Sequence, residues 1–344
     1  AQPSRNTLHI TDRHLEERMM TQVKTRLTRS ISTVVVLAIV LVGTLSAAAQ
    51  DEPADRQVPA VTHNTWTTGT AMPTARMGAA AAAVGTSIYV VDGYNPSSFL
   101  GVNEIYSPKK NTWTTGASDP NPRGFVAYVV VNKILYVFGG SNGSALLDIT
   151  ESYNPATNTW TTLAPMPYVQ ETAAAVAVKD VIYVMGGQGY DGFLANVESY
   201  NITTNTWTAE SPLLTATGWE AAAKLGASVV AVDGGNASTY FGNIEAYNAK
   251  KNSWSELPAD PTPREPGCYA VIKGELYVAG GDNGSNLTLN ESYNPKTKAW
   301  TTLAPMPQGI DYSGASAEAG GRLYCFGGGS FPSTAYNNVQ IYQP

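Results

Sequence analysis

The chain has 344 residues, of which 43% are hydrophobic and 14% charged, and its formal net charge at pH 7 is −6. An acidic chain argues against nucleic acid as a partner, because binding to a phosphate backbone needs a basic face. Its two cysteines, Cys268 and Cys325, are too few for a disulfide framework and match no metal motif. The sequence neither predicts nor excludes a single disulfide between them.

The N-terminal segment has the features of a targeting sequence. Residues 1–18 precede Met19 and Met20, where a signal peptide would begin, so we expect them to be untranslated. Basic residues then precede an apolar run from Val34 to Leu45, and three alanines follow it. This order predicts a signal peptide over residues 19–49, a linker over 50–61, and a secreted or periplasmic bacterial protein.

An uncleaved anchor is the alternative for this segment, because the run from Ile31 to Ala49 is barely long enough to span a bilayer. Cleavage would leave no membrane contact. It would also remove six basic and three acidic residues of the 21 and 27 in the chain, leaving 15 and 24, a net charge of −9.

From residue 62 to 344 the chain repeats. Tryptophans recur at intervals of 47, 47, 47, 47 and 46 residues, at Trp66, Trp113, Trp160, Trp207, Trp254 and Trp300. Each unit contains an Ala/Val-rich stretch, a second apolar strand, a glycine pair, a variable loop, and a Glu-x-Tyr before the next Trp. A period in the mid-forties with four short strands per unit predicts a propeller or a solenoid.

The glycine pairs mark where inner strands converge and backbones crowd. We place them at Gly139-Gly140, Gly186-Gly187, Gly234-Gly235, Gly280-Gly281 and Gly327-Gly328, with Asp92-Gly93 in the first unit. Together with the Tyr and Trp that follow, they closely resemble the kelch family over residues 62–344. The resemblance implies an all-β, six-bladed kelch β-propeller with four-stranded antiparallel blades.

The two ends of the repeat region predict how the ring closes. The last unit ends at Tyr342 without a Trp, whereas the first begins with Asn64-Thr65-Trp66, an outer strand without its predecessors. The N-terminal strand should therefore complete the last blade and leave no open edge. In blade four, Ala231 replaces the tyrosine of the other blades, and we expect Trp219 to fill the gap.

Functional residues are expected on the face that carries the variable loops. Counting 17 residues back from each second glycine gives one equivalent position per blade: Arg76, Arg123, Gln170, Gly218, Arg264 and Asp311. The next position reads Met77, Gly124, Glu171, Trp219, Glu265 and Tyr312. Positions that differ between blades are free for function.

Arginines are the first candidate ligand-binding group. In kelch domains of ubiquitin-ligase adaptors, arginines at this strand entrance bind acidic peptides, and Arg76, Arg123 and Arg264 look similar. Pairing with a local carboxylate or a backbone carbonyl is the alternative. For Arg264 and Arg76 the expected partner is Asp311, which comes from the blade between theirs. Arg123 lacks such a neighbour in the ring, so it is the better ligand candidate. The glutamate repeated in five blades is expected to be structural.

Aromatic and acidic residues of blades three and four form the second group. Trp219, Glu220, Tyr190 and Tyr240, with Glu171 nearby, suit a sugar or a peptide side chain. Gln170, Asp311 and Tyr312 complete the candidate ligand-binding set.

Two functions follow, neither needing a cofactor or a metal. The first is a binding module that recognises a protein or glycan, with acidic groups, at the channel mouth. The alternative is a carbohydrate epimerase or mutarotase acting on an acidic sugar, by analogy with a bacterial periplasmic kelch protein, with Glu171 or Glu220 as the acid-base group and Arg123 on the carboxylate. The mature chain has one histidine, His63, which argues against copper oxidases and serine hydrolases.

Overall fold

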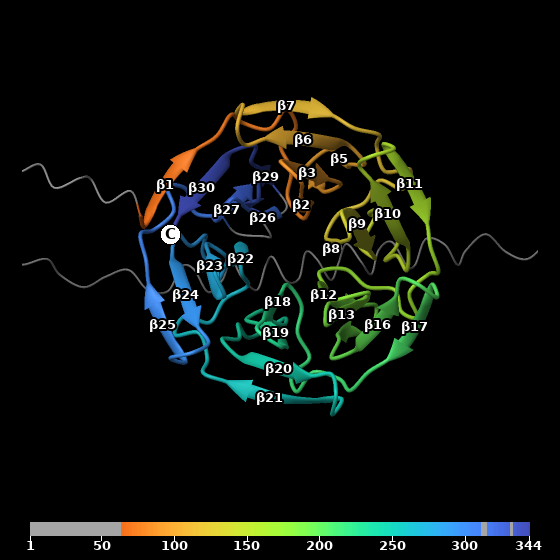
Figure 1. Cartoon of the computed structure of the whole chain (residues 1–344), viewed down its shortest axis with the longest axis vertical. Coiled ribbons are helices and arrows are strands. Elements are labelled where there is room, and N and C mark those ends of the chain that lie inside the picture. The colour runs from red at the N-terminus through yellow and green to blue at the C-terminus, as the bar shows by residue number, and fades with distance from the viewer. Residues whose placement is uncertain (1–62, 311–314, 331–332) are drawn as a thin grey trace, which may run out of the picture. The chain divides into compact units, whose positions relative to one another are not determined.

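The computed structural model describes residues 63–310, 315–330 and 333–344. These residues form a ring of six four-stranded antiparallel sheets around a central axis (Figure 1). The expected fold is therefore confirmed. The boundaries predicted for the untranslated segment, signal peptide and linker lie outside the described residues. Within the described ranges, no helix is long and apolar enough to cross a membrane.

Each blade is a meander of short strands whose first strand lies nearest the axis. Blades one to three contain β2 (Ala80–Val84), β3 (Ser87–Val91), β6 (Asn103–Ser107), β7 (Thr112–Thr115); β8 (Ala127–Val131), β9 (Ile134–Phe138), β10 (Thr150–Asn154), β11 (Thr159–Thr162); and β12 (Ala174–Val178), β13 (Val181–Met185), β16 (Val197–Asn201), β17 (Thr206–Ala209). Blades four and five contain β18 (Ala221–Leu225), β19 (Ser228–Val232), β20 (Ile244–Asn248), β21 (Ser253–Leu257); and β22 (Cys268–Ile272), β23 (Glu275–Ala279), β24 (Asn290–Asn294), β25 (Ala299–Thr302).

Blade six is assembled from both ends of the domain. It contains β26 (Ala315–Ala319), β27 (Arg322–Phe326), β30 (Val339–Gln343) and, as its outer strand, β1 (Thr65–Thr68). Strand β1 pairs antiparallel with β30, with Trp66 opposite Tyr342. The predicted closure by the N-terminal strand is confirmed, and it gives blade six the fourth strand that its own repeat lacks.

A Tyr–Trp pair stabilises the outer half of every blade. The ring centroids lie between 4.9 and 5.4 Å apart, as for Tyr106 and Trp113 or Tyr293 and Trp300. The indole also donates a hydrogen bond to the preceding blade; Trp113 Nε1 lies 2.8 Å from the Thr70 carbonyl oxygen. The repeated aromatic residues therefore link neighbouring blades as well as packing within one.

Blade four closes its tyrosine gap differently from our expectation. Ala231 lies in a core cluster with Tyr183 and Tyr247, whose ring centroids are 5.4 Å apart. Trp219 instead lies at the channel, 5.4 Å from the ring of Phe193. The prediction that Trp219 fills the gap is wrong, because neighbouring tyrosines already border Ala231.

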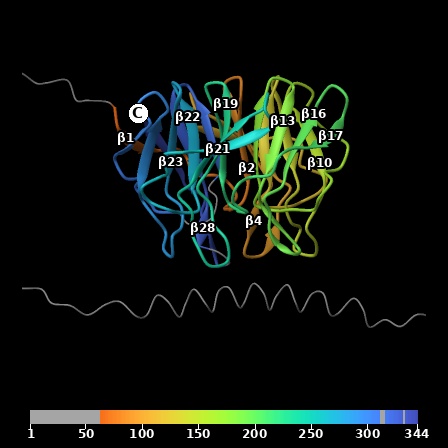
Figure 2. The same ribbon diagram turned by 90° about the horizontal axis from the view of Figure 1, so that it is seen from below.

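Two faces of the ring differ in construction. The loop face carries the segments that lead into each first strand and the long connections between second and third strands. Three of these connections form small hairpins: β4 (Tyr94–Asn95) with β5 (Ser98–Phe99), β14 (Gln188–Gly189) with β15 (Gly192–Phe193), and β28 (Gly329–Ser330) with β29 (Thr334–Ala335). The turn face carries the short turns between first and second and between third and fourth strands. Figure 2 shows β4 and β28 on one side of the ring and the C-terminus with β1 toward the other.

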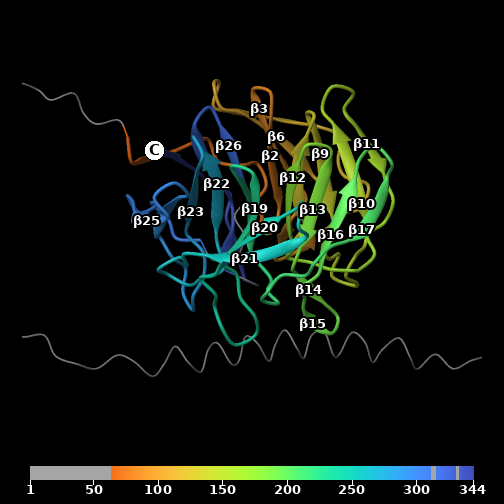
Figure 3. The same cartoon turned by 60° about the horizontal axis from the view of Figure 1, so that its bottom comes forward.

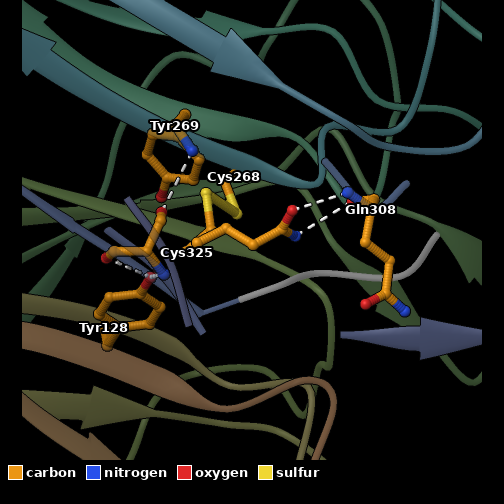
Figure 4. The surroundings of a disulfide bond; sticks show 7 residues. Tyr128, Cys268, Tyr269, Gln308 and Cys325 are labelled. Atoms are coloured by element: carbon orange, nitrogen blue, oxygen red, sulfur yellow. Dashed lines mark hydrogen bonds between the residues drawn. A yellow bond between two sulfur atoms is a disulfide. The ribbon is translucent and has the colours of Figure 1, made fainter. Parts of the chain in front are cut away.

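A disulfide joins blades five and six. Cys268 of β22 is bonded to Cys325 of β27, with Cα atoms 5.8 Å apart, and both side chains are buried (Figure 4). Next to it, the Tyr269 backbone N–H donates to Ser316 Oγ, and Tyr128 Oη lies 3.1 Å from both the backbone nitrogen and the carbonyl oxygen of Ser316. The sequence left undecided whether Cys268 and Cys325 form a disulfide, and in the structure they do.

Candidate functional site

In two blades, the residue that occupies the equivalent position at the loop face differs from the one that the sequence predicted. Backbone N–H groups at the end of each second strand donate to one residue of the following blade, and these acceptors are Arg76, Arg123, Gln170, Thr217, Arg264 and Ile310. Thr217 and Ile310 therefore take the places that we assigned to Gly218 and Asp311.

Backbone geometry explains both errors. In blade four the turn is Asp233-Gly234, with φ angles of 58° and 106°, which match 63° and 106° at Asp92-Gly93. Counting 17 residues back from Gly235, rather than from Gly234, gives Gly218 in place of Thr217. In blade six, Ile310 lies five residues before β26, whereas Arg264 lies four before β22. Asp311 and Tyr312 themselves lie outside the described residues.

The three arginines of this ring are fully buried and paired with carboxylates. Arg76 Nη2 lies 2.8 Å from Glu104 Oε2, and Arg264 lies 2.9 Å from both Asp260 and Glu291. Asp233 of blade four approaches Arg264 of blade five to 3.8 Å. Asp260, Glu291 and Asp233 are thus the partners found for Arg264 among the described residues, and the predicted pairing with Asp311 lies outside them.

Arg123 has the densest set of partners. Its guanidinium nitrogens lie 2.5 Å from Glu151, 3.3 Å from Asp119 and 4.0 Å from Asp92 of the preceding blade. Although burial alone lowers the pKa of Arg123, these three carboxylates raise it above its usual value. For Arg76, burial outweighs Glu104 and Asp92 and lowers the pKa. The expectation that no neighbour neutralises Arg123 is wrong, because Asp92 and Asp119 lie outside the ring position that we compared.

The repeated glutamate has a structural role in these blades, as we expected. Glu104, Glu151 and Glu291 pair with the arginine of their own blade. Blades three and four keep the glutamate as Glu198 and Glu245 but have Gln170 and Thr217 in place of the arginine. Burial raises the pKa of Glu198 to about 7 and also raises that of Glu245. Gln170 is itself buried, which removes its side chain from the surface.

A belt of backbone hydrogen bonds lines the channel on its loop side over blades one to four. Phe125 donates to Gly78, Thr172 to Phe125, and Trp219 to Thr172, over 2.7 to 2.9 Å. All four have φ between 56° and 61°, a region that costs energy for Thr, Phe and Trp. The next equivalent residue, Pro266, has no N–H to donate. Sequence reasoning missed this belt, although its 47-residue spacing was present.

Two cavities occupy the channel. The loop-side cavity, about 50 Å³, is lined by the belt residues together with Glu220, Tyr128 and Tyr269. A larger one of about 260 Å³ opens on the turn side, between alanines and valines of the first strands, and is also bordered by Tyr128 and Tyr269. Tyr128 of blade two and Tyr269 of blade five therefore lie between the two cavities.

The aromatic and acidic candidates do not converge in one pocket. Trp219 and Glu220 line the loop-side cavity, but Glu220 is 5% exposed and packs against Gly186. Tyr190 Oη accepts a hydrogen bond from the Leu146 N–H of blade two, while Tyr240 Oη donates to Asp282 of blade five. The two tyrosines thus tie their loops to blades on opposite sides.

Two buried or half-buried carboxyl groups near this mouth have altered acidity. Burial raises the pKa of Glu171 to about 7, and burial raises that of Glu220 well above its ordinary value. Glu171 could therefore hold a proton near neutral pH. No cation lies among the described residues that line the loop-side cavity, and no group of three or more His, Cys, Asp or Glu in the described ranges is placed to hold a metal ion.

Exposed apolar side chains gather on the same arc. Within the described residues, the exposed large hydrophobic side chains are Tyr168, Tyr190 and Leu214, at 51%, 49% and 57% exposure. All three lie on loop-face segments of blades three and four. Sequence reasoning missed Tyr168 and Leu214, because a Pro-rich loop gives no periodic signal for exposure.

Comparisons with known proteins agree with this architecture. A family model for the Attractin/LZTR1 β-propeller matches residues 88–291. Kelch-like protein 35 of Mus musculus is 32% identical over 75 residues, and kelch-like protein 25 of Xenopus tropicalis is 35% identical over 80 residues. Each match covers 22% of this chain and 13% of the relative, so the chain spans a small part of these proteins.

A solved structure supports the fold over most of the domain. The structure of YjhT superimposes with a TM-score of 0.68 at 18% identity, covering 78% of this chain and 95% of that one. At this identity the likeness concerns the fold alone. With six kelch repeats closed into a ring and a family match over more than half of its length, the chain belongs to the Attractin/LZTR1 β-propeller family.

Proposed function

We propose that this propeller is an exported protein-binding module whose loop face, over blades three and four, binds a polypeptide segment with apolar and basic side chains. Kelch-type propellers generally mediate protein binding. The observation that carries the proposal is the gathering of Tyr168, Tyr190 and Leu214 on one arc. Exposed apolar side chains that cluster, rather than scatter, mark interaction surfaces.

The three side chains belong to segments that are neighbours in space. Gln188, the first residue of β14, forms a bridge with Glu171, and after β15 Leu194 forms a bridge with Thr217. The β14–β15 hairpin, which carries Tyr190, therefore lies between the segment that contains Tyr168 and the segment that contains Leu214. Figure 3 shows this hairpin projecting from the ring. Together these segments form one continuous docking arc.

Charge on this arc favours a basic partner. Asp191 is exposed on the β14–β15 hairpin, and Asp148 is exposed on the neighbouring loop of blade two. Glu210 is half-buried at the start of the segment that contains Leu214. The arginines of the loop face are buried against carboxylates. An acidic ligand, which we expected from the sequence, would find no exposed cation among the described residues of this face. Complementary charge selects partners and speeds association.

The size of the loop-side cavity favours surface docking over a buried small ligand. Its volume of about 50 Å³ is far below the roughly 300–1,000 Å³ of ligand pockets. The sugar epimerase alternative needs Arg123 on the substrate carboxylate, yet Arg123 is buried among three carboxylates. A glycan on the loop face would have to contact the surface aromatics, because the larger cavity of about 260 Å³ opens on the turn side. A protein segment fits the exposed arc better than a buried sugar does.

Export is the second part of the proposal. The signal-like residues 19–49 support it, and so does the Cys268–Cys325 disulfide, since disulfides persist in oxidising compartments. N-terminal sequencing of the protein from culture medium or periplasm should begin near residue 50. A cytosolic protein that retains residues 19–49 and carries two free thiols would contradict export.

Peptide selection tests the binding function. The fragment 50–344 retains every strand of the ring, so it should fold on its own. A displayed library of random peptides selected on this fragment should yield sequences rich in Arg, Lys and large apolar residues. The double variant Tyr168→Ala/Leu214→Ala should weaken the selected peptides by at least tenfold, since these truncations remove exposed contact area without touching the core.

A matched control uses loops of two other blades. Ser97→Ala/Thr288→Ala changes two exposed side chains on loops of blades one and five and should leave affinity unchanged. Selection of acidic peptides, or full binding by the Tyr168/Leu214 variant, would overturn the assignment of the arc.

A further inference from the structure

The turn face of the propeller carries nearly all of its accessible positive charge. Eleven exposed basic residues lie at or beside its turns: Lys109, Lys110, Lys133, Lys179, Lys224, Lys250, Lys251, Lys273, Lys296, Lys298 and Arg322. The other described basic residues are the three buried arginines of the loop face. Three carboxylates share the turns, Asp180, Glu275 and Glu318, which leaves the face at +8. We propose that this turn face docks onto anionic lipid headgroups.

Turn chemistry alone does not account for this charge. Hairpin turns favour small and polar residues such as Gly, Asn and Asp, and those residues would serve here without any cation. The turns of this ring instead include the pairs Lys109-Lys110 and Lys250-Lys251 and the pair Lys296 and Lys298. The sign of the charge is therefore a property of the face beyond the needs of its turns.

The paired lysines surround the ring. Lys109-Lys110 follow β6 in blade one, and Lys250-Lys251 follow β20 in blade four, three blades away. Single cations from blades two to six lie nearer the axis, at or beside the first turns. Because the face consists of short turns and the hairpins project from the opposite face, its cations can approach a planar surface together (Figure 2).

Long-range repulsion does not prevent such docking, although residues 50–344 carry a net charge of −9. At physiological salt, exposed charges are screened beyond about 8 Å, so a surface in contact with the turn face is affected mainly by that face. Basic clusters bind anionic leaflets with contributions from each Lys or Arg near the surface. The exposed apolar residues of the loop face would then point away from the membrane, free for a partner.

The proposed export decides between the two anionic surfaces that a basic face can bind. We favour lipid over nucleic acid because an exported domain lies beside a membrane.

Vesicle sedimentation tests the proposal, using fragment 50–344, which lacks the apolar run. It should bind vesicles of equal parts phosphatidylglycerol and phosphatidylcholine but not vesicles of phosphatidylcholine alone. Binding should be lost as salt rises to about 1 M, where the screening length falls to about 3 Å. Replacing Lys109, Lys110, Lys250 and Lys251 with Gln should weaken binding by more than about 100-fold, at about fivefold for each lysine.

A charge-matched variant separates the face from the net charge. Ser97→Glu, Ser144→Glu, Ala237→Glu and Ser285→Glu together change the net charge equally, at exposed loop-face positions, and should leave vesicle binding within about threefold of the parent, because these positions face away. Equal weakening by both variants would overturn the proposal, as would no binding to anionic vesicles. Tighter binding to short duplex DNA than to vesicles would make the face a nucleic-acid surface instead. Thermal melting of all variants confirms that they fold.

Discussion

Blades one, two and five differ from blades three and four in how they hold the same glutamate. In the first group an arginine neutralises it, and at two junctions an aspartate from the preceding blade adds a second contact, Asp92 to Arg123 and Asp233 to Arg264. In the second group Gln170 and Thr217 replace the arginine. No ion pair among the described residues crosses between blades two and three or three and four. The same arc carries Tyr168, Tyr190 and Leu214.

This difference separates stability from recognition within one ring. Buried charge clusters are costly to break, because removing one partner leaves an uncompensated charge. Blades with such clusters are therefore restricted in sequence at this position. Blades three and four are free of that restriction, and they are the blades whose loops expose apolar side chains. We infer that the arginine clusters hold the ring so that the other arc can serve binding.

The largest effect is expected from breaking the densest cluster. Arg123→Met leaves Asp92, Asp119 and Glu151 buried without a cation, and should destabilise the domain by about 3–5 kcal/mol. Thr217→Val, at the equivalent position of blade four, should cost about 1 kcal/mol or less, since Thr217 Oγ1 makes only long hydrogen bonds of 3.3 Å. Urea denaturation of both variants measures the loss in the free energy of unfolding for each. Equal losses would mean that the arginine clusters are no more important than the uncharged positions.

The disulfide should rank second. Cys268→Ala/Cys325→Ala, or reduction, removes a crosslink across 57 residues between blades five and six, and should cost about 2–4 kcal/mol. Thermal melting with and without reductant gives the value, and the double alanine variant is the control that should not respond to reductant. Free thiols in the untreated protein would contradict the disulfide. Packing alone would then hold blades five and six together.

The pH dependence should be smaller and should include contributions from both groups of blades. Burial raises the pKa of Asp119, Glu171, Glu198 and Glu291 to about 7. A carboxyl whose folded pKa is raised takes up a proton more readily when folded, so stability should increase as pH falls from about 8 toward about 5. Melting temperatures across this range measure the slope, and a fall in stability would contradict the raised values.

Neutral variants of the repeated glutamate sharpen that test. Glu198→Gln in blade three removes an unpaired buried charge and should stabilise the domain at pH 8 by about 1–2 kcal/mol while flattening the slope. Glu151→Gln in blade two removes a partner of Arg123 and should destabilise it. The same sign for both variants would remove the distinction between the blades.

The sequence by itself determined the ring. Six tryptophans at a spacing of 46 or 47 residues, the glycine pairs and the missing final Trp sufficed for the blade count, the strand order and closure by β1. These features repeat because each blade must satisfy the same packing against its neighbours. Six copies of one pattern therefore predict the strands even where a single copy is ambiguous, whereas each loop occurs only once.

Tertiary structure decided the site, because function rests on positions that do not repeat. The register at Thr217 and Ile310 depended on backbone angles and on one extra residue before β26, and the burial of Arg123 depended on Asp92 of another blade. The exposure of Tyr168 and Leu214 and the gathering of lysines on the turn face likewise follow from strand direction around the closed ring. Contacts between residues distant along the chain, and the solvent that they exclude, are set only when the ring closes.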